Sequence, residues 1–139
     1  MALRQYYRIT DRRHPALMLE VGGQAPQGPL FVCIISNTAP WTYLGKRAVH
    51  ANPLAGFDSG LDVFAMRKLR SLGTFLAVGQ MLSGTGRPPH GKSILTFHDE
   101  AELTLRSDRP AALQVDGEYV GEREAVRFRS VPRALRVIS

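Results

Sequence analysis

The chain has 139 residues, of which 44% are hydrophobic, and this suits a single domain, residues 1–139, with a core of its own. A single cysteine excludes a disulfide framework and favours a reducing cytoplasm. The sequence contains no apolar run of about 18 residues and no signal-peptide pattern, so neither a membrane span nor secretion is expected. The formal net charge of +6 should attract phosphates, whether on nucleic acid, anionic lipid or a nucleotide.

The first half of the chain predicts strands separated by loops. Residues 17–21 alternate in the way that is typical of a half-buried strand. The run 30–35 is apolar on both faces and too short for a helix, which predicts a central strand covered on both sides. Residues 37–53 contain a tryptophan and are expected to form an ordered loop. A turn is expected at 58–60, and a strand over 61–66.

A helical pattern follows, and its start is crowded by basic residues. Apolar residues recur there at spacings of three and four, namely Leu69, Leu72, Phe75, Leu76, Met81 and Leu82. Two interpretations compete: a core helix lying on a sheet, or a basic amphipathic segment resting on an anionic membrane. The core helix is favoured, because Thr74, Gly79 and Gln80 leave no richly basic opposite face.

The rest of the chain consists of short alternating segments broken by proline and glycine. They are 94–97, 101–106, 112–116, 118–120, 126–129 and 135–138. Short strands at this spacing are typical of antiparallel sheets. The expected fold class is therefore mainly β, a β-rich α+β fold, arranged as a two-layer antiparallel β-sandwich with one or two helices.

One motif matches a nucleotide-binding pattern formally. Gly86–Ser93 satisfies G-x-x-x-x-G-K-[ST], the phosphate-binding loop of many nucleotide hydrolases. That loop must leave a buried strand and enter a helix, whereas here a helical pattern precedes it and 94–97 has the pattern of a strand. Pro88 and Pro89 also remove two backbone donors. The sequence therefore predicts that residues 86–93 form a flexible basic connection and not the phosphate-binding loop of a nucleotide hydrolase.

Histidine and arginine point to no further site. No paired spacing of the zinc type occurs among His14, His50, His90 and His98. His98 with Asp99 resembles a base and its orienter, but neighbours along a strand point to opposite faces. The Arg residues are dispersed and do not interleave with aromatic residues, so nucleic acid is not expected as a partner.

The strongest turn signal lies within residues 113–121. Asp116-Gly117 between alternating residues is typical of a two-residue hairpin. Such a turn would place Asp116 and Glu118 two residues apart at the rim of a sheet, where carboxylates can bind a metal ion or take a proton. The alternative is that Asp116 serves only the turn and that Glu118 is a solvated strand residue.

Several segments resemble one known family in the right order. They are 35–37, 41–45, 57–63, 111–118, 126–128 and 131–137. Together they resemble the second, β-rich domain of the diacylglycerol kinase family of lipid kinases, which includes sphingosine kinases and bacterial soluble lipid kinases. The likeness runs from about Ala16 to Ile138, and the Gln-Val-Asp-Gly-Glu string at 114–118 is its most specific part.

The resemblance implies the carboxy-terminal domain of an ATP-dependent lipid kinase, which phosphorylates the hydroxyl of diacylglycerol or a related lipid and uses ATP and Mg²⁺. The family's nucleotide loop, Gly-Gly-Asp-Gly-Thr, does not occur in this sequence. The chain alone is therefore expected to be inactive, and an amino-terminal kinase domain is its expected partner. The family likeness also implies phospholipid metabolism, a cytoplasmic location and peripheral contact with the membrane. A homodimer is left open.

The resemblance also suggests roles for three acids. Asp116 matches the acid near the acceptor hydroxyl, as general base or as a ligand of the catalytic magnesium. Glu118 would help to hold that magnesium or orient Asp116. Asp58 matches the position where bacterial members hold a structural magnesium, although Asp-Ser-Gly stands here in place of the commoner Asp-Asp-Gly. A plain turn residue at Asp58, and a non-catalytic lipid or anion-binding module for the whole chain, are the alternatives.

Overall fold

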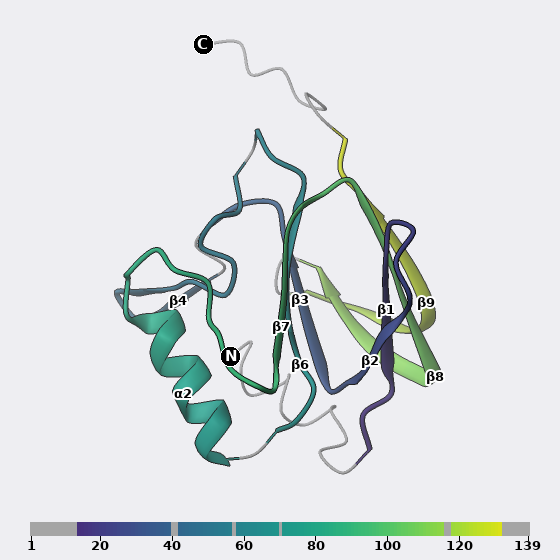
Figure 1. Cartoon of the computed structure of the whole chain (residues 1–139), viewed down its shortest axis with the longest axis horizontal. Helices are drawn as coiled ribbons and strands as arrows, with labels where there is room; N and C mark the ends of the chain where they lie inside the picture. The colour runs from purple at the N-terminus through teal and green to yellow at the C-terminus, as the bar shows by residue number, and fades with distance from the viewer. Residues whose placement is uncertain (1–13, 40–41, 57, 70, 116–117, 132–139) are drawn as a thin grey trace.

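A computed structural model describes residues 14–39, 42–56, 58–69, 71–115 and 118–131. Within these residues the chain is 53% strand with one helix, and every strand pairing is antiparallel. Figure 1 shows two sheets and a layer that contains the helix. The predicted mainly β fold class is confirmed.

The first sheet has four strands in the order β2-β1-β8-β9. Their bounds are β1 Leu17–Val21, β2 Gln27–Leu30, β8 Glu102–Val115 and β9 Glu118–Arg129. The last two strands form the hairpin predicted from Asp116-Gly117, since Val115 pairs with Glu118 across a two-residue connection. Register shifts interrupt the hairpin twice, and its far part bends away from the rest of the sheet (Figure 1).

The second sheet has three strands in the order β3-β6-β7. Their bounds are β3 Val32–Ser36, β6 Leu61–Met66 and β7 Ile94–Glu100. The helix layer covers the outer face of this sheet and consists of β4 Thr42–Leu44, β5 Arg47–Val49 and α2 Ser71–Leu82, with their connections. The segment 37–53, expected to be a loop, thus contains a small antiparallel pair.

Two cores lie on opposite sides of β6, whose six residues are all buried. The core between the two sheets contains Leu19, Val21, Leu30, Leu61, Val63, Ala65 and Leu103. The core between the second sheet and the helix layer contains Val32, Val49, Ala51, Phe64, Met66, Ala77 and Met81. Alternate residues of β6 enter alternate cores, as the period of two requires.

The run 30–35 was predicted as one central strand covered on both sides: both of its faces are covered over β3, but the run is neither one strand nor central. Leu30 ends β2 in the first sheet, and Val32 begins β3 at the edge of the second. The run is apolar because the chain crosses between sheets at this point. Leu30 is buried in the core between the sheets and Val32 in the core under the helix. The central strand of the second sheet is β6 instead.

The predicted core helix exists, but three of the six residues of the predicted apolar stripe are exposed. Leu72, Phe75 and Leu76 are 74%, 76% and 60% exposed. The helix packs on the second sheet through Ala77 and Met81, which are buried. Two apolar stripes therefore lie on different sides of the helix, and periodicity alone does not show which one meets the sheet.

Gly60→Ala is expected to lower the free energy of unfolding by about 1–3 kcal/mol, because the backbone must move to admit the methyl group. A Cβ at Gly60 would lie 2.5 Å from the backbone oxygen of Glu100. Gly79→Ala is the matched control, since a Cβ there meets nothing within 4 Å and the helix should gain about 0.5–1 kcal/mol. Urea denaturation measures both, and equal effects would contradict this packing.

Candidate functional site

The hairpin end carries the predicted catalytic pair. Glu118 is the first residue of β9 and is exposed to solvent. Asp116 and Gly117 lie outside the described residues, but they are the two residues that join Val115 to Glu118. Large apolar side chains surround this end, namely Val115, Tyr119 and Val120, which are 49%, 52% and 42% exposed. The end of the hairpin thus offers a carboxylate among exposed apolar residues.

Asp58 lies apart from the hairpin in sequence and in sheet, in the turn that precedes β6. It is exposed, and Ser59 orders its turn by exchanging hydrogen bonds with the backbone of Gly56 at 3.0 and 3.3 Å. Among the described residues, no group of three or more His, Cys, Asp or Glu side chains is placed to hold a metal ion. A magnesium ion at Asp58 would therefore depend on backbone carbonyl oxygens, and this role stays a prediction.

A pair that the sequence did not reveal joins β6 to β7. The Asp62 carboxylate is buried, with its side chain 4% exposed, and both of its oxygens lie 2.8 Å from Nδ1 of His98. The backbone N–H of Asp99 also donates to Asp62, at 3.0 Å. The carboxylate therefore has partners from two successive residues of the neighbouring strand.

A register shift explains this geometry. Leu61 pairs with Glu100 and Val63 pairs with Phe97, so two residues of β7 stand opposite Asp62. This is the arrangement of a β-bulge, and Asp99 has φ 60°, in the left-handed region that short polar residues tolerate. Asp99 is not the partner of His98, as the alternation argument predicted. Its carboxylate instead accepts a hydrogen bond from the Gly60 N–H at 2.6 Å.

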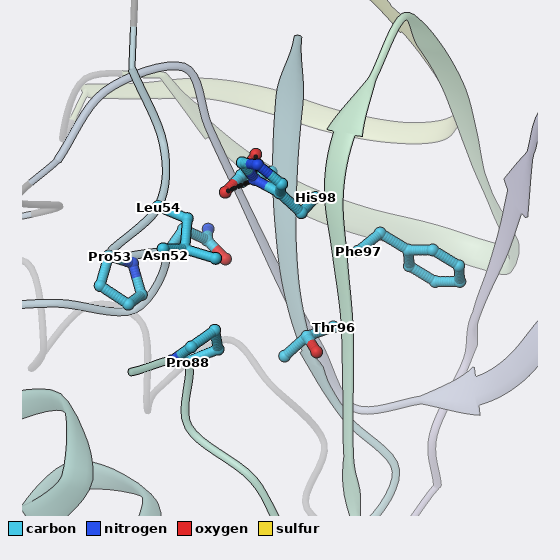
Figure 2. A pocket seen from close by; sticks show the side chains of 8 residues that line it. Asn52, Pro53, Leu54, Pro88, Thr96, Phe97 and His98 are labelled. Atoms are coloured by element: carbon cyan, nitrogen blue, oxygen red, sulfur yellow. Dashed lines mark hydrogen bonds and ion pairs between the residues drawn. The ribbon is translucent and has the colours of Figure 1, made fainter. Parts of the chain in front are cut away.

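The pair opens on a small pocket of about 130 Å³ (Figure 2). The residues that line it are Asn52, Pro53, Leu54, Asp62, Pro88, Thr96, Phe97 and His98. The ring of Phe97 points away from the pocket toward the first sheet, while the other labelled side chains gather around the opening. The pocket lies between the second sheet and the helix layer.

Buried Asn52 forms the other polar contact at this pocket. Its Nδ2 donates to Ser36 Oγ at 2.9 Å and to the Ile34 carbonyl at 3.3 Å. Ser36 is the register partner of Asp62, so Ser36, Asp62 and the bulge at His98 form a polar row across the three strands. The row is satisfied internally, because no buried side-chain N or O atom in the described part of the chain lacks a partner.

The polar row fixes the orientation of the His98 imidazole, but it does not form a Ser–His–Asp catalytic triad. A carboxylate only accepts hydrogen bonds, so the proton of a neutral His98 lies on Nδ1 and leaves Nε2 as an acceptor. A Ser–His–Asp triad requires the serine beside the histidine, whereas β6 with Asp62 lies between Ser36 and His98. The sequence signal for this pair was an aspartate within the apolar strand 61–66.

Cys33 is expected to react slowly with iodoacetamide. It packs against the core between the sheets, and burial raises the pKa of its thiol to about 12 from 9.0. The thiolate is the reactive form, so at pH 8 the rate should be roughly a thousandfold below that of an unperturbed thiol. Mass spectrometry of the labelled protein measures this rate, with the urea-unfolded chain as the control. Equal rates before and after unfolding would contradict the burial of this thiol.

The structure of segment 83–93, which contains the nucleotide-binding motif, differs from that of a phosphate-binding loop. It connects α2 to β7, and no helix begins at Ser93, as the strand pattern of 94–97 predicted. The side chain of Gln80 holds the connection to the helix by donating to the His90 carbonyl at 3.0 Å and accepting from the His90 N–H at 2.7 Å. The strand-to-helix context of a phosphate-binding loop is therefore missing.

The comparisons with known proteins do not assign the chain to a family. A scan against protein-family models finds no match for this chain, and a search of curated proteins finds no match either.

Within the described residues, no helix combines the length and apolar character that crossing a bilayer requires.

Proposed function

We propose that the chain is the carboxy-terminal domain of an ATP-dependent lipid kinase of the diacylglycerol kinase type. The observation that carries this proposal is the β8–β9 hairpin, in which a two-residue connection joins Val115 to Glu118. In the sequence, Asp116 is the first residue of that connection. Glu118 is exposed there, so a ligand brought by another domain can reach it. The resemblance of 114–118 to the family's Asp-Gly-Glu ending falls on this same turn.

The two acids suit the chemistry of phosphoryl transfer, which depends mainly on positioning and on neutralising charge. Asp116 accepts the proton of the acceptor hydroxyl or binds the metal, and Glu118 orients Asp116 or adds a second carboxylate. Mg²⁺, when bound with ATP, offsets the negative charge of the phosphates. One or two carboxylates are the usual protein share of such a site, because phosphate oxygens and waters complete the coordination.

The proposal includes an amino-terminal kinase domain as the partner that binds the nucleotide. The exposed apolar side chains around Glu118 support such a partner, since Val115, Tyr119 and Val120 would lose water on contact with it. A diacylglycerol-like lipid is the proposed substrate. The proposal therefore places the protein in the cytoplasm at the membrane surface, and Asp58 in the role of a structural magnesium ligand.

The test is the recovery of the tagged chain from its own cells, together with any domain that is joined or bound to it. The recovered protein should transfer the γ-phosphate of ATP to an acceptor lipid in mixed micelles, while the isolated chain should transfer none. Diacylglycerol, a sphingoid base and a glycerol glycolipid are tested separately, with phosphorylated lipid as the readout. Recovered protein that phosphorylates none of these three lipids would overturn the proposal.

A further inference from the structure

The charge of the helix layer has a single sign. Its segments, residues 42–56 and 67–93, contain none of the 12 acidic residues of the chain. Its described basic residues are Lys46, Arg47, Arg67, Lys68, Arg87 and Lys92. Among them, Arg67 reaches the first sheet, since its Nη2 donates to Oε1 of Gln27 at 3.0 Å. Outside these segments the described residues contain ten acids and five Arg or Lys residues, and the acid that follows the first segment most closely is Asp58, in the turn before β6. In the described part of the chain, the positive charge is therefore concentrated on the helix layer.

The same layer exposes large apolar side chains. On α2 they are Leu72, Phe75 and Leu76, which share one face because they are spaced by three and four residues. Tyr43 and Leu44 of β4 are 64% and 53% exposed. Basic side chains that are exposed in the same layer are Lys46, Arg47, Lys68, Arg87 and Lys92.

Contacts between the parts make the layer one unit. The His50 N–H after β5 donates to the Met81 carbonyl of α2 at 2.8 Å. Gln80, which precedes Met81 in the same helix, binds the backbone of His90, as described above. In Figure 1 the helix and the β4–β5 pair lie together on the left, opposite the first sheet. The elements that carry these exposed apolar and basic residues thus lie on one side of the molecule.

This combination fits an anionic bilayer better than a second copy of the chain. Leucine and aromatic side chains enter the boundary between headgroups and acyl chains, and Lys and Arg are attracted to anionic headgroups. Two copies of this layer placed face to face would bring their basic residues together and repel. Water exposure of three neighbouring large apolar side chains on one helix face is itself typical of an interaction surface.

We propose that the helix layer docks the protein on anionic lipid bilayers, with Leu72, Phe75 and Leu76 inserted at the interface and the basic residues on the headgroups. The inference rests on charge and exposure and does not require the kinase proposal. If the chain is part of a lipid kinase, this surface would hold the enzyme at the membrane that contains its acceptor.

Co-sedimentation with vesicles tests the docking without ATP or any other domain. The full chain should bind vesicles of phosphatidylcholine mixed with phosphatidylglycerol, bind phosphatidylcholine alone much less, and lose binding as salt rises. Phe75→Ser should weaken binding to the mixed vesicles by about tenfold, because the aromatic ring no longer leaves water. Val131→Ser is the control, since this apolar residue is 56% exposed just beyond β9 and outside the helix layer, and it should change binding little.

Charge reversal provides a second pair of variants. Arg47→Glu in the helix layer should weaken binding by at least about fivefold, whereas Arg129→Glu on β9 makes the same change in net charge and should have a smaller effect. The proposal is overturned if the wild-type chain does not bind the mixed vesicles at low salt, or if both members of each pair act alike. It is also overturned if Phe75→Ser leaves vesicle binding intact and instead disrupts the association with a nucleotide-binding domain. Vesicle binding by the chain, combined with no lipid phosphorylation by the protein recovered from its own cells, would leave this inference standing and reject only the proposed function.

Discussion

Replacing Phe64 by alanine is expected to lower the free energy of unfolding by about 3–5 kcal/mol. Phe64 is 1% exposed and belongs to the central strand β6. Its ring fills the core under the helix together with Val49, Met66 and Ala77, and the strands around it leave little freedom to close the cavity. Urea denaturation followed by circular dichroism measures the loss.

Two controls separate packing from residue type. Phe64→Leu keeps most of the volume and should cost about 1.5 kcal/mol or less. Phe75→Ala removes the same side chain from a position that is 76% exposed, so its effect should stay within about 0.5 kcal/mol. A similar loss for Phe64→Ala and Phe75→Ala would contradict the assignment of the buried and exposed faces in the helix layer.

Asp116→Asn is expected to reduce phosphoryl transfer to lipid by a factor of about 10²–10⁴ in the complete kinase, the range associated with loss of a general base. The amide keeps the shape of the side chain and its place in the turn but cannot take a proton. Glu118→Gln should also reduce the rate, because it removes negative charge next to the proposed metal. Transfer of labelled γ-phosphate into lipid measures both variants.

Glu122→Gln is the matched control for this pair. Glu122 is an exposed acid on the same strand, four residues beyond Glu118, and it pairs with Ala112 inside the hairpin rather than at its end. Its rate should equal that of the wild type. Full activity of Asp116→Asn, or an equal loss for Glu122→Gln, would remove the end of the hairpin from the mechanism, and circular dichroism of each variant checks that folding is unchanged.

Local patterns were sufficient where the structure depends on neighbours in sequence. The period of two located β1, the turn signal at 58–60 located the start of β6, and Asp116-Gly117 located the turn between β8 and β9. The order of helix and strand around Gly86–Ser93 was also sufficient to reject a phosphate-binding loop. Each of these features is set by turn chemistry or by alternation over a few residues.

Features that depend on contacts between distant parts of the chain could not be predicted from local sequence patterns. The run 30–35 is apolar both in a central strand and in a crossing between two cores, and only the pairing partners distinguish these cases. Leu72 and Ala77 both fit a helical apolar stripe, but the smaller residue faces the sheet. The pairing of Asp62 with His98 depends on a one-residue shift between β6 and β7, which no local pattern encodes.

The most direct measurement of the central proposal is paramagnetic broadening of amide signals by Mn²⁺ bound in place of Mg²⁺ with ATP, in the native protein recovered with its nucleotide-binding domain. If the end of the β8–β9 hairpin meets the metal and the phosphates, adding ATP with Mn²⁺ will broaden the amides of Glu118 and Tyr119 strongly, beyond any broadening that Mn²⁺ alone causes around Asp58, while those of Thr74 and Gly79 on α2 will not change. Broadening centred on the pocket, with a sharp Glu118 signal, would contradict the proposed kinase site.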